Sequence, residues 1–218
     1  MNLYDNFVFR GLSRFLDMFF LSVLWLICCI PIVTIGAATT ALYEMAYKNI
    51  RHERGYAIRG FFASFKSNFK QSTILGLLFT VIFGCLGFDC YIMYIYKLEG
   101  NPAAKYTIGF WILILIALLW SFYVFPYVAR FKNTTKEVLK NTFFIMVGNP
   151  GSTLLLLLIF VIQCLGIYMY TPAIIVIPVL YNYFKSLILE KVFKRYLTQE
   201  QIALEEEKNG VYSKKKKK

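Results

Sequence analysis

Five long apolar runs with few charges inside them constrain this chain more than any other feature. They lie at about residues 17–43, 72–94, 108–128, 152–170 and 173–189. A helix needs about 20 consecutive apolar residues to cross the hydrocarbon core of a bilayer. Inside that core every backbone N–H and C=O needs an internal partner, which a helix supplies by itself. We therefore predict an all-α fold: a polytopic transmembrane helical bundle of about five spans.

The overall composition agrees with this fold class. Of the 218 residues, 58% are hydrophobic and only 17% are charged, whereas about a quarter are charged in a typical soluble domain. We predict one membrane domain over residues 1–195, followed by a charged cytoplasmic helix and lysine-rich tail over 196–218. Two amphipathic segments, 1–15 and 61–71, are expected to form interfacial helices. Arg59, just before the second segment, and Lys66 and Lys70 within it are the expected contacts with anionic lipid headgroups.

The basic residues predict how the spans are oriented. The net charge is +12, and Lys and Arg gather in segments 49–71, 129–151 and the C-terminal tail. By the positive-inside rule these segments are cytoplasmic in a multi-pass protein of the cell membrane. The same pattern argues against a nucleic-acid partner, because the basic residues alternate with apolar spans. Five crossings place the N-terminus outside, although Arg10 and Arg14 argue mildly against that outcome.

Pro31 interrupts the first apolar run. Proline lacks a backbone N–H and disfavours helical geometry in the residue before it, so the helix is expected to break there. Thr34 can cap a second helix. A run of about 27 residues is short for two crossings, so we favour one tilted, broken crossing over 17–43. The alternative is a re-entrant hairpin, which keeps the N-terminus inside.

The break has two interpretations. A half-helix that starts after Thr34 would direct its positive end at a solute, as some transporters do. Alternatively, Thr34 or Thr39 satisfies the freed carbonyls, and small residues such as Gly36 let other helices pack closely. Packing is the favoured interpretation. The candidate solute or packing site comprises Pro31, Thr34, Gly36, Thr39 and Asp89.

Asp89 is included because ionisable residues within spans are costly and often functional. Its place near the end of its run favours solvation at the outer interface over a solute or proton site. Lys185 is expected to extend from the fifth run toward the cytoplasmic surface. Residues 72–87 and 152–166 share a Ser-Thr start and a Cys-Leu-Gly end, so a repeat of two hairpins remains an open alternative.

Enzyme chemistry is not indicated. No spacing assembles a nucleophile with a base, and no Gly-rich phosphate loop follows a strand. There is no Cys-x-x-Cys, and His52 is the single histidine, so we expect no metal and no cofactor.

Three segments carry a family resemblance. Residues 25–43, which include PIVTIGAATTALY, are followed by FFASFKSNFKQ at 61–71 and by LKNTF at 139–143 with GNP at 148–150. Together they resemble the YesL family of bacterial membrane proteins, over most of residues 5–195. The resemblance implies a polytopic protein of unknown molecular activity, often associated with carbohydrate uptake or utilisation, and it supplies no catalytic residues.

Two functions follow as hypotheses. The favoured one is a non-enzymatic accessory or interaction protein, associated with a carbohydrate transporter complex and with an anionic bilayer. The alternative is a small transporter or permease with a site at the broken first helix.

Overall fold

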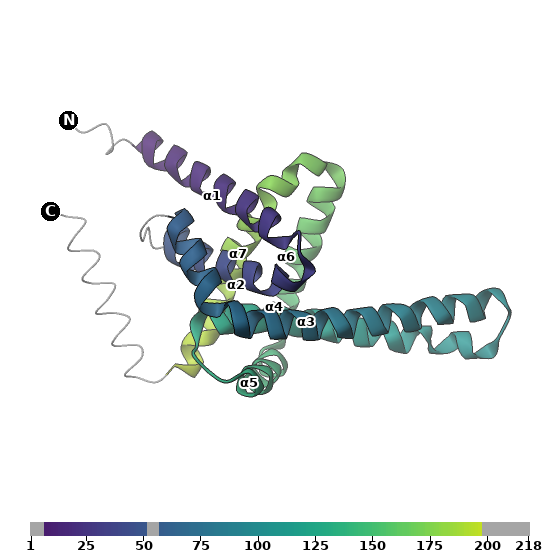
Figure 1. Ribbon diagram of the computed structural model, residues 1–218. Helices are drawn as coiled ribbons and strands as arrows, with labels where there is room; N and C mark the ends of the chain where they lie inside the picture. The colour runs from purple at the N-terminus through teal and green to yellow at the C-terminus, as the bar shows by residue number, and fades with distance from the viewer. Residues whose placement is uncertain (1–6, 52–56, 198–218) are drawn as a thin grey trace, which may run out of the picture.

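The computed structural model describes residues 7–51 and 57–197, and within these ranges every regular element is a helix, with no strand (Figure 1). The all-α prediction is confirmed. The predicted cytoplasmic helix and lysine tail lie almost wholly outside the described residues, as do the side chains of the predicted interfacial helix at 1–15. A short turn of helix, η6 (Lys194–Tyr196), follows the last long helix.

The predicted break at Pro31 is confirmed, but the chain reverses there instead of continuing in line. α1 (Phe7–Cys29) is followed by a 3-10 turn, η2 (Ile32–Thr34), and by α2 (Ile35–Met45). The Trp25 indole N–H donates to Thr39 Oγ1 over 3.4 Å, whereas a continuous helix would hold these residues about 20 Å apart along its axis.

A second contact of the α1–α2 hairpin lies farther from the turn. Leu21 is fully buried in one cluster with Ala41 and Leu42 of α2. The single broken crossing expected over 17–43 is therefore wrong, and the hairpin alternative describes this segment. The physical reason is that the small residues of α2 let it pack closely against α1 after the chain reverses.

The predicted surface helix at 61–71 is also wrong. It forms one continuous helix with the predicted span 72–94: α3 (Ala57–Leu98) runs for 42 residues. Phe61 is fully buried beside Ala57 and α2 residues, so this half of α3 packs in the bundle and does not lie flat on a surface. No proline or glycine pair near Ser72 interrupts the helical hydrogen bonds, which is why the helix continues.

α3 and α4 (Thr107–Arg130) form a long hairpin, joined through a 3-10 turn, η4 (Pro102–Tyr106). In Figure 1 this hairpin projects away from the other helices. Accordingly, none of residues 80–116 is buried. The outer half of the hairpin thus presents apolar side chains on all sides, as a lipid-facing segment does.

α5 (Thr135–Gly148) lies in the segment 129–151, for which the sequence indicated only a basic loop. Thr134 and Glu137 form a capping box at its start. α6 (Pro150–Met169) and α7 (Ile177–Phe193) form a second hairpin through η5 (Thr171–Ile175). The π-helical turn η3 (Ala46–Arg51) extends α2.

Three helical segments of the described chain are long and apolar enough to cross a membrane: Ala57–Leu98, Pro102–Arg130 and Pro150–Met169. They contain three of the five predicted spans. The apolar part of α1, Leu16–Cys29, is shorter, and the predicted fifth span divides into η5 and the 17-residue α7.

Candidate functional site: a polar pocket at the basic end

The predicted site residues of the first run lie at the α1–α2 turn, where they serve packing. The Thr34 hydroxyl donates to the carbonyls of Cys28 over 2.5 Å and of Pro31 over 2.8 Å. Thr34 occupies the N-cap position of α2 but makes no side-chain cap hydrogen bond. Its hydroxyl therefore satisfies carbonyls that the break frees, as the packing interpretation requires.

Gly36 lies at a close crossing of α2 and α3. A Cβ placed on it would lie 2.1 Å from the Ser72 carbonyl oxygen and 3.1 Å from the Gly76 Cα of α3. Beside this crossing, Thr40 Oγ1 and Ser72 Oγ share a buried hydrogen bond of 2.9 Å. Close backbone contact through small residues is the usual mode of helix association in membranes, and it fills this region.

Asp89 does not join the other predicted site residues. It lies 13 residues beyond Gly76 on α3, about 20 Å along the helix axis, and it is partly exposed in the projecting hairpin. Lys185 also differs from expectation. It is only 3% exposed, because its side chain is enclosed by aromatic residues of α4 and α7, so it does not reach a surface.

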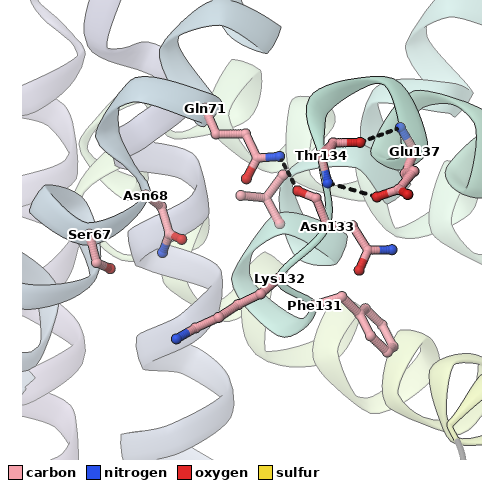
Figure 2. Close-up of a pocket in the computed structure, with 9 residues that line it drawn as sticks. Ser67, Asn68, Gln71, Phe131, Lys132, Asn133, Thr134 and Glu137 are labelled. Carbon is pink, nitrogen blue, oxygen red and sulfur yellow. Dashed lines mark hydrogen bonds between the residues drawn. The ribbon is translucent and has the colours of Figure 1, made fainter.

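A polar pocket of about 460 Å³ lies where α3, the α4–α5 connection and the start of α5 meet (Figure 2). Side-chain amides and hydroxyls dominate its lining, together with one ammonium and one carboxylate. Its residues are Ser67, Asn68 and Gln71 of α3, Val128 of α4, Phe131, Lys132, Asn133 and Thr134 of the connection, and Glu137 of α5.

Hydrogen bonds fix the wall between α3 and the connection. Gln71 Nε2 donates to the Asn133 backbone carbonyl over 2.7 Å (Figure 2). The Asn133 side-chain amide in turn donates to the Tyr127 hydroxyl over 3.0 Å, and so does that of Asn141 from α5. Tyr127 is 5% exposed, so these bonds connect the pocket to the buried core.

The α5 side of the pocket is held by the capping box. The Thr134 backbone N–H donates to Glu137 Oε2 over 2.9 Å, and the Glu137 N–H donates to Thr134 Oγ1 over 3.4 Å (Figure 2). Two hydrogen bonds with Thr134 lower the pKa of Glu137. The bond with the Thr134 backbone has the larger effect, and the bond with its side chain has the smaller one. The pocket therefore keeps a carboxylate at neutral pH.

The opposite side of the pocket connects to α2 through Glu44. Its carboxylate accepts hydrogen bonds from Ser64 and, over 3.4 Å, from the Asn68 amide, and it pairs with Lys48. Asn68 also donates to the Ser64 carbonyl over 3.1 Å. The hydrogen bonds of Glu44 thus link α2 to the α3 wall of the pocket.

A buried ion pair secures the same region. Arg130 Nε lies 3.2 Å from Glu190 Oε2 of α7, and the Tyr43 hydroxyl of α2 donates to Glu190 Oε1 over 3.2 Å. Glu190 is 1% exposed. The sequence placed Arg130 in a basic segment, 129–151, and indicated no partner for Glu190. Their pairing depends on contacts between distant elements, for which the sequence carries no local signal.

Exposed lysines lie on the elements that line the pocket. They come from α3, the α4–α5 connection and α5, and we call the part of the molecule that carries them the basic end: Lys66, Lys70, Lys132, Lys136 and Lys140. Arg59, the third expected headgroup contact, is also exposed and lies near the start of α3. Amides, hydroxyls and ammonium groups of this kind can hydrogen-bond a polar or acidic segment, but they do not assemble a nucleophile with a base.

Comparison with known proteins gives one family. Residues 18–90 match the family described as "Protein of unknown function, DUF624". YesL-like proteins are members of DUF624, so the family resemblance is confirmed. The matched range covers α1 from Met18 onward, all of α2 and most of α3, including Ser67, Asn68 and Gln71 of the pocket. No curated protein and no solved structure gives a significant match.

Proposed function

We propose that this chain is a non-enzymatic accessory protein of the cell membrane that meets a carbohydrate transporter at its basic end. The expectation that the partner is a carbohydrate transporter comes from the resemblance to the YesL family. The proposed position of the contact surface rests on one observation, the polar pocket. It is open, it is lined by groups that hydrogen-bond, and the elements that form it carry exposed lysines.

The rigidity of the pocket supports a docking role. Its walls come from three elements and are joined by hydrogen bonds from Gln71 and Asn133, while the Arg130–Glu190 pair ties the adjoining helices together. A preformed surface binds a partner with a smaller loss of conformational entropy than one that must be ordered on binding. Its lysines favour a partner segment with acidic residues.

We further propose that the basic end faces the cytoplasm and contacts anionic headgroups through Lys66 and Lys70. The α1–α2 hairpin supports this orientation, because it returns the N-terminal segment, with Arg10 and Arg14, toward the same side as the end of α2. A reporter at the N-terminal end is expected to give a cytoplasmic signal. An external signal would contradict the orientation.

Co-purification from native membranes tests the proposed function. Lys132→Glu reverses a charge in the pocket, and Lys105→Glu makes the same change on an exposed lysine of η4, at the tip of the projecting hairpin. The wild type and Lys105→Glu are expected to retain a carbohydrate-transporter subunit in lipid nanodiscs, and Lys132→Glu to lose it. Retention of that subunit by Lys132→Glu, or its absence from the wild type, would refute the proposal.

The alternative function is a small permease with a site at the broken first helix. It is less well supported, because the Thr34 hydroxyl is engaged and Gly36 is packed against α3. Sugar or oligosaccharide flux into proteoliposomes that depends on Thr34 or Asp89 would favour the permease over the accessory protein.

A further inference from the structure

Lys185 is a buried cation in the middle of α7. Its Nζ lies 5.5 Å from the centre of the Phe122 ring and 5.3 Å from that of Tyr181. The Phe160 ring contacts both, with centroid distances of 5.1 Å to Phe122 and 6.1 Å to Tyr181. The ammonium group thus lies over an aromatic wall built by α4, α6 and α7.

Within residues 7–51 and 57–197, no carboxylate forms an ion pair with Lys185. Glu190 lies on the same helix, but it is engaged by Arg130 and Tyr43. An ammonium group carries three donors and no acceptor. Aromatic faces offset part of its desolvation, but they accept no conventional hydrogen bond, so the charge is left without an anionic partner.

A second group beside Lys185 also has an unused donor. Tyr181 lies four residues earlier on α7, so the two side chains share one helix face. The Tyr181 hydroxyl is buried and has no hydrogen-bond partner in the described chain. Buried polar atoms in native proteins almost always have a partner, so this cluster points to a bound species.

We propose that Lys185 and Tyr181 hold a small monovalent inorganic anion, such as chloride, between α4, α6 and α7. A single anion can accept hydrogen bonds from both the ammonium and the phenol hydroxyl, and it neutralises the buried charge. A lipid phosphate is a poor fit. Lys185 is 3% exposed, so a bulky lipid headgroup has no access to its ammonium group. The site is independent of the partner surface proposed above.

Chloride-dependent stability of the full chain in detergent tests this site. The thermal midpoint is measured in sodium chloride and in sodium gluconate at equal ionic strength. The wild type is expected to show a saturable rise in midpoint with chloride, since a ligand bound only to the folded state stabilises it. Lys185→Met is expected to lose that rise, and Tyr181→Phe to weaken the apparent affinity about tenfold. Lys191→Met, on an exposed lysine of the same helix, should behave as the wild type.

Direct binding of radioactive chloride provides a readout that does not depend on stability, and it covers the case in which Lys185→Met fails to fold. Saturable binding by the wild type that is weakened in Tyr181→Phe supports the site. Two results would overturn it. One is a wild type whose thermal midpoint and ion binding are the same for chloride and for gluconate. That result is expected if only water bridges Lys185 and Tyr181. The other is a folded Lys185→Met that retains the full chloride response.

Discussion

Gly36→Ala is expected to destabilise the helix crossing at the centre of the bundle. The added methyl would lie 2.1 Å from the Ser72 carbonyl oxygen and 3.0 Å from a ring carbon of Phe125. Ordinary van der Waals contact begins near 3.4 Å, so α2 and α3 must separate by more than an ångström. The oxygen belongs to the backbone of a long helix and cannot rotate away. Overpacking of this kind costs about 1–3 kcal/mol.

For a chain of this size such a loss lowers the thermal midpoint by about 2–12 °C. Fluorescence-detected size-exclusion chromatography after heating measures the midpoint in detergent. Gly84→Ala is the matched control, because a Cβ at that α3 position meets nothing within 4 Å. Its midpoint should stay unchanged or rise by a few degrees, about 2–4 °C at most. Equal midpoints for Gly36→Ala and the wild type would refute the close crossing.

Three further predictions concern the hairpin, the ion pair and the cap. With the native cysteines replaced, cysteines at Trp25 and Thr39 should be joined by a short bifunctional thiol reagent, and failure to crosslink would contradict the chain reversal. Glu190→Ala should lose about 3–5 kcal/mol of stability, because it leaves Arg130 buried without its carboxylate. A double change of both residues to Met should lose less in the same unfolding assay. The lowered pKa of Glu137 means that its stabilisation of α5 is full above the usual carboxyl value of 4.5 and is lost as the pH falls below it. The hydrogen-exchange protection factors of the first turn of α5, corrected for the intrinsic pH dependence of amide exchange, should therefore fall in acid for the wild type. A Glu137→Gln variant with the same fall would contradict the role of the charge.

The features predicted correctly from the sequence are those with local causes. Pro31 breaks a helix because of its own covalent structure. The small residues that follow it pack closely because they lack bulk, and Gly36 lies against α3 as the packing interpretation required. Long apolar runs likewise predict membrane helices without any tertiary information. The all-α class follows from such runs alone.

Features that depend on tertiary partners could not be predicted in this way. The length of the first run favoured a single crossing, but the reversal at Pro31 is stabilised by contacts such as Leu21 with Ala41. Lys185 and Glu190 were assigned to surfaces because charged side chains usually lie there. Both are buried because aromatic rings or an arginine from other helices enclose them.

The pocket was missed because its residues are common types in basic, polar segments. The FFASFKSNFKQ segment pointed to a lipid-facing surface, while Asn68 and Gln71 within it build a polar wall instead. The signal that could have identified them is the placement of amides on one face of α3 at i and i+3 spacing. The residues opposite them, such as Asn133, come from a connection that carried no periodic pattern.

Site-specific photo-crosslinking in living cells tests most directly whether the basic end is the partner surface. A photoreactive amino acid at Thr134 places the probe at the pocket, and one at Ile112, which is 52% exposed, places it on the outer half of the hairpin. We predict a defined crosslink from position 134 to a carbohydrate-transporter subunit and none to that subunit from position 112. Crosslinking of that subunit from position 112 but not from 134 would contradict the proposed surface.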